Sequence, residues 1–269
     1  MLAWKLTGQF SFTLFLATLG SALAIQLATN FFNDEIDAQK GTDTQDRLGP
    51  TRVTASGLLS SKTVYAIAAL FIMLAGLCAI PLVLTRGWPI LAIGIPSLFL
   101  AYGYTGGPFP LAYLGLGELF VVLFFGVIAV AGSAFVQSGL YLPPALWLGI
   151  TVGCLSAVLI SINNLRDIEE DTQANKRTLA VRLGPEKATK IIFAEYLISI
   201  IAFYISCGQP DIPEMFFAIL VIFLPAIRIL GAVKELGPSR ALNSQLALAG
   251  AHLVLFAIAY QLQLFLVSR

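Results

Sequence analysis

The 269-residue chain is 58% hydrophobic and only 12% charged, with a mean hydropathy of +0.85. A soluble globular domain carries about 25% charged residues, so this composition excludes an ordinary soluble fold. The formal net charge of +1 provides no basic surface for a nucleic acid, and we expect no nucleic-acid partner. The sequence therefore predicts a protein that is embedded in a lipid bilayer.

Apolar stretches recur along the whole chain, at about the length of ~20 residues that a helix needs to cross the hydrocarbon core. Eight stretches are expected, at about 10–32, 63–84, 88–102, 119–136, 145–162, 191–206, 215–230 and 242–267. They lack the apolar and polar alternation of barrel strands, and a helix satisfies its own backbone groups in lipid. We therefore expect an all-α polytopic bundle that forms a single domain over residues 1–269.

Lysine and arginine are distributed unevenly between the loops. The loops after the first, fifth and seventh stretches hold 12 of these residues, whereas the opposite side holds only Lys5, Arg86 and Arg269. Because cytoplasmic loops retain positive charge, this bias places the three loops in the cytoplasm and both termini outside. We expect a multi-pass protein of the inner (plasma) membrane with its active site on the cytoplasmic side.

Two acidic clusters follow the first and fifth stretches, and they resemble each other. Each opens with an asparagine four residues before an aspartate, and each is followed by the tetrapeptide Arg-Leu-Gly-Pro. The matching positions are Asn33 and Asp37 with Asn163 and Asp167, and 47–50 with 182–185. This internal repetition predicts two copies of one four-helix unit, at about 10–138 and 145–267, with a functional site between the halves.

The spacing of the second cluster favours a metal site. Asn163, Asp167 and Asp171 are four residues apart, which places them on one face of a continuous helix with ~40° of drift per step. Oxygen ligands without imidazole or thiolate are those that Mg²⁺ prefers, and Mg²⁺ bridges carboxylates to phosphate oxygens. The pattern predicts a diphosphate substrate.

In the first cluster, the helix must end before Asp43 if this aspartate is to lie beside Asn33 and Asp37. Asp43 lies six residues after Asp37 and would point away on a continuous helix. We expect Gly41 to end the helix and let Asp43 turn back.

Basic residues flank both clusters. A single charged run after a membrane helix is usually a solvated loop, but two matched runs on one side of the membrane favour a site. The residues expected to hold phosphate oxygens are Lys40, Arg47, Arg52, Lys176 and Arg177. A separate acid, Glu118, begins an apolar stretch. Because an unpaired carboxylate is energetically costly inside a membrane, we expect Glu118 either to pair with another group or to transfer protons.

The motifs resemble those of a known family. Residues 33–43 (NDEIDAQKGTD) and 163–171 (NNLRDIEED) with 176–181 (KRTLAV) are similar to the two aspartate-rich motifs of the UbiA superfamily of prenyltransferases. The segment 104–118 (YTGGPFPLAYLGLGE) resembles the 1,4-dihydroxy-2-naphthoate prenyltransferases of menaquinone and phylloquinone synthesis. The similarity extends over nearly the whole chain.

The resemblance implies a Mg²⁺-dependent transfer of a polyprenyl group from its diphosphate to an aromatic ring, here dihydroxynaphthoate. The residues it assigns to Mg²⁺ and diphosphate are Asn33, Asp37, Asp43, Asp167 and Asp171, with Lys40, Arg166 and Lys176 as phosphate contacts. It also brings Tyr104 toward the site, where a tyrosine face would stabilise an allylic cation. Asp37, Asp167, Tyr104 and Glu118 are then the candidate catalytic residues.

Two alternatives stay open at this point. The acceptor could be 4-hydroxybenzoate or homogentisate, as in other members of the superfamily. A bundle with repeated halves and intramembrane acids is also compatible with a secondary transporter. The apolar stretches predict eight helices, whereas members of the family resemble nine-helix proteins. We therefore expect that one N-terminal helix is missing here, with an exposed apolar groove where it normally packs.

Overall fold

The computed structural model of the chain describes residues 1–41, 54, 57–208 and 212–267, and their regular structure is entirely helical. Each of the eight expected apolar stretches forms a long helix. These are α2 (Phe12–Gln39), α3 (Ser61–Arg86), α4 (Trp88–Gly103), α5 (Gly117–Val121) continued by η2 (Val122–Ile128) and α6 (Ala129–Ser138), α7 (Pro143–Arg166), α10 (Pro185–Ser206), α11 (Ile212–Leu236) and α12 (Leu242–Val267). Short helices are α1 (Leu2–Thr7), η1 (Leu111–Leu114), α8 (Ile168–Gln173) and α9 (Leu179–Leu183). The prediction of an all-α polytopic bundle is confirmed.

The apolar surface of these helices fits a bilayer. Within the described residues, six helices are long and apolar enough to cross a membrane, and α4 is a shorter apolar helix. Large hydrophobic side chains such as Leu84, which is 82% exposed, cover the outside of the helices. Exposed apolar surface on this scale is stable against lipid and unfavourable against water.

Local chemistry sets where the helices begin. The Ser11 hydroxyl accepts a hydrogen bond from the backbone N–H of Leu14 at 3.3 Å, and Ser60 does the same for Thr63 at 3.3 Å. Such caps satisfy N–H groups that have no partner in the first turn. α7 and α10 instead begin with proline, at Pro143 and Pro185, whose fixed φ suits the first helical position.

The chain divides into two compact units. Unit 1 consists of Met1–Phe10, Glu118–Ile168 and Leu179–Arg269, and unit 2 consists of Ser11–Gly117 and Glu169–Thr178. The two sequence repeats that we predict divide the chain elsewhere, because the fourth long helix is grouped with unit 1 from Glu118 onward. The repeats stay a prediction.

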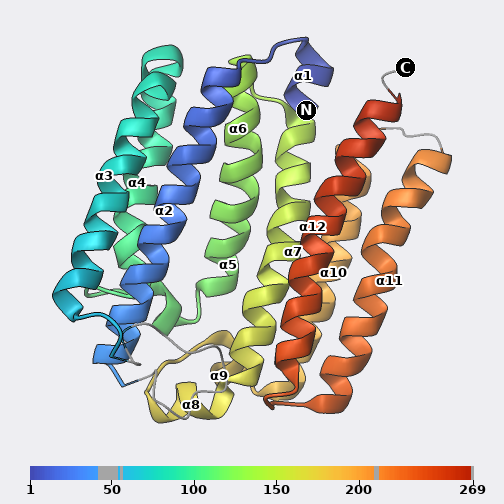
Figure 1. Cartoon of the computed structure of the whole chain (residues 1–269). Helices are drawn as coiled ribbons and strands as arrows, with labels where there is room; N and C mark the ends of the chain where they lie inside the picture. The colour runs from blue at the N-terminus through green and yellow to red at the C-terminus, as the bar shows by residue number, and fades with distance from the viewer. Residues whose placement is uncertain (42–53, 55–56, 209–211, 268–269) are drawn as a thin grey trace. The chain divides into compact units, whose positions relative to one another are not determined.

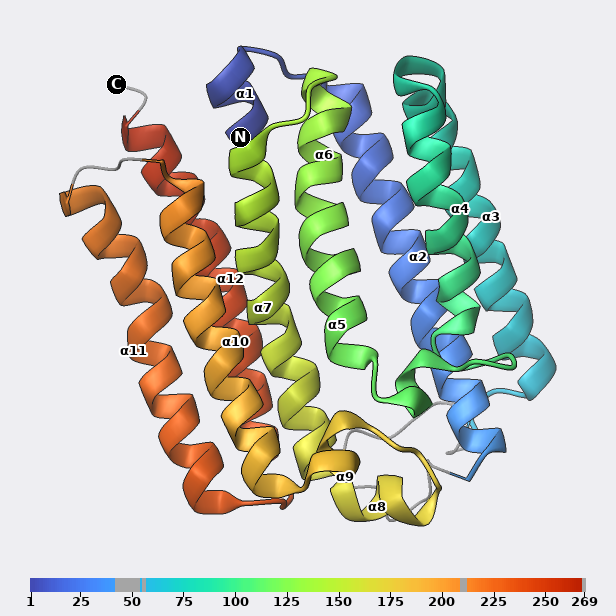
Figure 2. The same cartoon turned by 180° about the vertical axis from the view of Figure 1, so that it is seen from behind.

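Unit 2 is built on α2, α3 and α4, which lie side by side in both views (Figures 1 and 2). Gly20 brings α2 close to α3, where the Sγ of Cys78 would lie 3.0 Å from a Cβ added at Gly20. Nearer the first acidic cluster, the ring of Phe32 packs edge-on against Tyr102, with 5.3 Å between centroids. These contacts hold the C-terminal end of α2 against α4.

Unit 1 is built around α7, which packs against η2, α6, α10 and α12 (Figure 2). Its apolar core includes Val158, Ile162, Ile192 and Phe203, which are fully buried. On the other side of α7, small residues let two backbones meet. A Cβ added at Gly126 of η2 would lie 2.3 Å from the carbonyl oxygen of Gly149. Close backbone approach through glycine is the usual means of helix association in membranes.

Candidate active site

The first acidic cluster lies at the end of α2 in unit 2. Asp34, Glu35 and Asp37 are buried, and Asp37 is only 6% exposed. α2 ends at Gln39, and Gly41 follows with φ of +72°, a left-handed conformation that favours glycine. The expectation that Gly41 ends this helix is confirmed.

Tyr113 connects the side chains of this cluster, although no sequence pattern singles it out. Its hydroxyl donates a hydrogen bond to Oδ1 of Asp37 at 2.8 Å. The ammonium of Lys40 lies 3.9 Å from the centroid of the Tyr113 ring, a cation–π distance. One tyrosine thus contacts a predicted metal ligand and a predicted phosphate ligand.

The loop after α4 lies against the same cluster. Within it, Thr105 is 1% exposed, and its hydroxyl donates a hydrogen bond to the side-chain oxygen of Asn33. The backbone carbonyl of Thr105 accepts a hydrogen bond from Lys40 Nζ at 2.8 Å. Thr105, next to the predicted Tyr104, therefore fixes two residues of the first cluster.

Part of the second acidic cluster also belongs to unit 2. Asp171 is buried, and its Oδ1 lies 3.4 Å from Nζ of Lys176. That ammonium is 5.6 Å from the centroid of the Tyr113 ring. Asp37, Lys40, Tyr113, Asp171 and Lys176 form what we call the lysine–tyrosine cluster, which unites residues of both acidic clusters.

The electrostatics of this cluster favour an anion. Although Lys40 is largely exposed, partial loss of solvent lowers the pKa of its ammonium from the usual value. The Asp37 carboxylate opposes this shift, and the positive charge of Lys176 adds to the lowering of the Lys40 pKa. Two cations that repel each other are stabilised when an anion binds between them.

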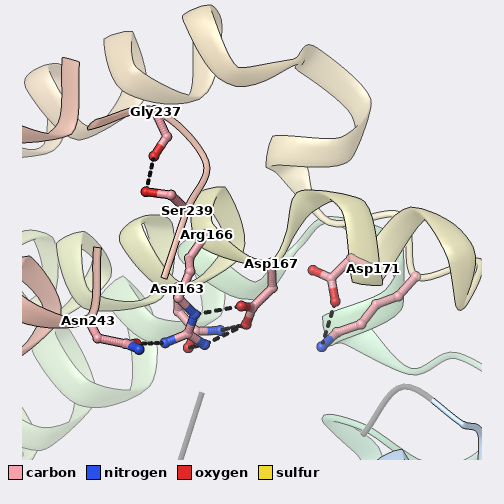
Figure 3. A network of polar contacts seen from close by, with 8 residues as sticks. Asn163, Arg166, Asp167, Asp171, Gly237, Ser239 and Asn243 are labelled. Atoms are coloured by element: carbon pink, nitrogen blue, oxygen red, sulfur yellow. Dashed lines mark hydrogen bonds and ion pairs between the residues drawn. The ribbon is translucent and has the colours of Figure 1, made fainter. Parts of the chain in front are cut away.

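The rest of the second cluster forms a separate network in unit 1 (Figure 3). The guanidinium of Arg166 binds both carboxylate oxygens of Asp167, with Nε to Oδ1 at 2.5 Å and Nη2 to Oδ2 at 2.6 Å. It also donates to Oδ1 of Asn163 at 2.8 Å and to Oδ1 of Asn243 at 2.6 Å. Arg166 is 2% exposed, so these partners offset the cost of its burial.

Glu118 begins the fourth long helix and is 8% exposed. Its Oε1 accepts a hydrogen bond from the Asn164 amide at 2.9 Å. A pairing role, one of the two roles expected for this acid, is therefore present in unit 1.

Comparisons with known proteins assign the chain to a family. The model of the UbiA prenyltransferase family matches residues 1–241. The chain belongs to the UbiA prenyltransferase family. Together with its apolar helices, this membership makes it a multi-pass membrane protein.

Two curated relatives of this chain have the same name. It is 35% identical over 190 residues to the 1,4-dihydroxy-2-naphthoate octaprenyltransferase of Haemophilus influenzae, with 68% of the chain and 62% of the relative aligned. It is 37% identical over 178 residues to the 1,4-dihydroxy-2-naphthoate octaprenyltransferase of Mycobacterium tuberculosis, with 66% and 60% aligned. The chain thus spans less than two thirds of the length of these curated relatives.

Solved UbiA structures have the same fold. The apo structure of a UbiA homolog from Aeropyrum pernix K1 aligns with a TM-score of 0.69 at 20% identity, covering 94% of this chain and 90% of that one. A UbiA homolog from Archaeoglobus fulgidus, bound to DMAPP and Mg²⁺, aligns with a TM-score of 0.58 at 14% identity, covering 96% and 92%.

One geometric expectation for the UbiA motifs is wrong. The chain does not present Asn163, Asp167 and Asp171 on one continuous helix, because α7 ends at Arg166 and Asp167 has φ of −94° and ψ of 15°. α8 begins after this residue, and Asp171 lies on it. The break lies where the apolar sequence ends and Arg166 draws the Asp167 carboxylate to itself.

The other predicted ligands divide into described and undescribed residues. Arg177 is exposed in unit 2. The predictions for Asp43, Arg47 and Arg52 lie outside the described residues. Tyr113, Asn164 and Asn243 were missed because their partners are far away in sequence, which no local spacing reveals.

The donor atoms of the UbiA motifs fit a hard cation. In the described part of the chain, no three His, Cys, Asp or Glu side chains gather closely enough to form a metal site. The side chains present are nevertheless carboxylates and amides, without imidazole or thiolate. This oxygen-only set suits Mg²⁺.

Proposed function

We propose that this protein transfers a polyprenyl or phytyl group from its diphosphate to 1,4-dihydroxy-2-naphthoate, with release of CO₂ and diphosphate, in menaquinone or phylloquinone synthesis. The observation that carries the proposal is the lysine–tyrosine cluster. It joins residues of both aspartate motifs, and it places two ammonium groups around one tyrosine beside buried carboxylates.

The cluster supports binding of a diphosphate. Lys40 and Lys176 act on each other as like charges, and a diphosphate would offset that repulsion. Tyr113 and the Thr105 carbonyl hold the Lys40 ammonium in place before substrate arrives. Preorganised cations of this kind stabilise negative charge that develops on a leaving group.

In unit 2, Asp37, Asp171 and Asn33 are the residues that would hold Mg²⁺. In unit 1, Asp167 and Asn163 offer the same kind of oxygen ligands for Mg²⁺. When bound, Mg²⁺ supplies charge that stabilises departing diphosphate. The support for Mg²⁺ is the oxygen-only donor set of these side chains. The UbiA homolog bound to DMAPP and Mg²⁺ adds support from a protein of the same fold.

The side chains of this protein have distinct tasks in the proposed reaction. Lys40 and Lys176 neutralise diphosphate, and the Tyr113 hydroxyl orients Asp37. As the bond between the prenyl carbon and diphosphate breaks, a ring carbon of the acceptor attacks the resulting allylic cation. Tyr104 is proposed to stabilise that cation with its ring.

The acceptor is proposed from the relatives, whose names include 1,4-dihydroxy-2-naphthoate octaprenyltransferase. The concentration of Lys and Arg in three loops supports an active site on the cytoplasmic side of the inner membrane. The two aspartate motifs lie at the C-terminal ends of α2 and α7, where these helices lead into two of those loops. A transporter would instead place its charges near the middle of the bilayer.

The product mass tests the proposed acceptor. With Mg²⁺, detergent-purified protein should join dihydroxynaphthoate to geranylgeranyl, phytyl or longer diphosphates and yield a product without the carboxyl group. Mass spectrometry of the extracted product and measurement of released diphosphate check this result. A prenylated product that retains the carboxylate, or activity with 4-hydroxybenzoate or homogentisate alone, would refute the proposed acceptor.

The Lys176→Ala variant tests the diphosphate site. It should raise KM for the prenyl diphosphate about 10-fold, because a charge-assisted hydrogen bond contributes about 1.5 kcal/mol or more. KM for dihydroxynaphthoate should change much less. Lys190→Ala is the matched control, since Lys190 is exposed and forms an ion pair with the exposed Glu186. Equal effects of Lys176→Ala on both substrates would show that Lys176 is structural.

A further inference from the structure

Two buried carboxyl groups face α7 within unit 1, and only one of them was expected. Glu118 accepts a hydrogen bond from Asn164, and Glu195 of α10 accepts one from the Ser161 hydroxyl at 2.7 Å. Asn164 and Ser161 are three residues apart on α7, so they lie on the same face of that helix. We call Glu118 and Glu195 the carboxyl pair.

The carboxyl pair is held firmly in the apolar part of unit 1. Glu118 and Glu195 are 8% and 7% exposed, and Asn164 and Ser161 are also buried. Gly126 lets the helix that carries Glu118 approach the backbone of α7 closely. The segment Val122–Ile128, which begins four residues after Glu118, is a π-helix, a rare form that occurs frequently at functional sites.

Each acid of the pair has one oxygen that the protein leaves open. Among the described residues, Oε2 of Glu118 and Oε2 of Glu195 have no hydrogen-bond partner although both atoms are buried. A buried polar oxygen without a partner is costly, so it indicates a group that arrives with a ligand. The required ligand is a hydrogen-bond donor.

The hydrogen bonds distinguish the two acids of the pair. The Asn164 amide nitrogen can only donate, so Oε1 of Glu118 accepts from it. The Ser161 hydroxyl contacts Glu195 and can both donate and accept. Glu118 is therefore held as a hydrogen-bond acceptor, whereas Ser161 leaves the hydrogen bonding of Glu195 adaptable.

We propose that the carboxyl pair binds a hydroxyl group of the aromatic acceptor, that Glu118 takes the proton of this hydroxyl, and that Glu195 holds the hydroxyl in place. This inference rests on the proposed function. It assigns a role in recognition to Glu195, which lies outside both aspartate motifs.

Every bond and proton in the proposed prenyl transfer is accounted for. The bond between the prenyl carbon and diphosphate breaks, and diphosphate leaves with the electron pair. The ring carbon that bears the carboxylate forms the new carbon–carbon bond, while the neighbouring hydroxyl gives its proton to Glu118 and becomes a carbonyl. Loss of CO₂ returns an electron pair to the ring, and the oxygen takes the proton back from Glu118.

Other titratable groups surround the pair. The Cys154 thiol of α7 and the Tyr196 hydroxyl of α10 interact electrostatically with Glu195. The ring of Tyr196 stacks on that of His252 of α12, with 5.8 Å between centroids. Any change in pH dependence must therefore be compared with variants of these neighbours.

Isosteric variants test the pair. Glu118→Gln keeps an oxygen for Asn164 but removes the base, so kcat with dihydroxynaphthoate and geranylgeranyl diphosphate should fall about 100-fold or more. The midpoint of thermal unfolding and KM for geranylgeranyl diphosphate should stay unchanged. The kcat of Glu118→Gln should rise with pH as the acceptor hydroxyl ionises by itself, and Cys154→Ala, Tyr196→Phe and His252→Gln in the same background should keep that rise.

The second variant separates the two acids. Glu195→Gln should lower kcat about 10-fold, less than Glu118→Gln, because the amide still holds the acceptor hydroxyl while Glu118 remains to take its proton. Glu235→Gln, at an exposed position on α11, is the control and should have no effect. Wild-type kcat in Glu118→Gln, or a loss in Glu195→Gln as large as that in Glu118→Gln, would overturn the inference. Absence of prenyl transfer in the unmodified protein would instead refute the proposed function.

Discussion

Asp37→Asn should lower the rate of prenyl transfer by about 1,000-fold, equivalent to ~4 kcal/mol of transition-state stabilisation. The substitution removes a charge that Mg²⁺ and the diphosphate site are proposed to require, and it leaves an oxygen to accept the Tyr113 hydrogen bond. Because the shape of the side chain is preserved, the protein should still insert in membranes and unfold at its normal temperature. Initial rates at saturating Mg²⁺ check the first expectation, and thermal unfolding in detergent checks the second.

Asp167→Asn should reduce activity as severely but should also destabilise the protein. The buried guanidinium of Arg166 would lose its ion pair with Asp167, and breaking one side of a buried ion pair costs about 3–5 kcal/mol. Glu169→Gln is a matched control, because Glu169 is an exposed acid of the same motif. Near-native turnover in either aspartate variant, or equal inactivation by Glu169→Gln, would contradict the assignment of two acidic clusters to the site.

Local sequence patterns were enough to predict the helices and the end of α2. The apolar stretches show where the chain satisfies its backbone in lipid, and Gly41 marks the end of α2 because a left-handed residue follows the last turn. The regular spacing of the second motif was misleading at Asp167. There, a contact with Arg166 and the end of the apolar sequence outweigh helical periodicity.

Long-range contacts account for the residues that the sequence did not reveal. Tyr113 meets Asp37 across 76 positions, Asn243 meets Arg166 across 77, and Ser161 meets Glu195 across 34. No periodicity links such positions, since their proximity depends on which helices pack together. A family motif names the aspartates but not Tyr113, which orients Asp37, or Ser161, which binds Glu195.

The helix packing of unit 1 leads to a final prediction: Gly126→Ala should destabilise the folded protein by about 3 kcal/mol or more, at the upper end of what overpacking costs. The added Cβ would lie 2.3 Å from the Gly149 carbonyl oxygen and 2.4 Å from the Cα of Gly153. Both obstacles are backbone atoms, so no side-chain rotation relieves the clash. The helix that carries Glu118 would have to move away from α7.

Thermal unfolding in detergent, followed by size-exclusion chromatography, measures this effect. Gly231→Ala is the matched control in unit 1, because Gly231 is an exposed helical glycine with nothing within 4 Å of an added Cβ. Alanine there should be neutral or slightly stabilising, since alanine has a higher helix propensity than glycine.

The kinetics of Gly126→Ala distinguish a packing defect from a loss of substrate binding. The Glu118–Asn164 hydrogen bond depends on the same close approach of the two helices. Any Gly126→Ala protein that folds should therefore lose kcat, while KM for the prenyl diphosphate stays near normal. An unfolding midpoint equal to that of Gly231→Ala would show that the contact between η2 and α7 is looser than the glycine packing requires.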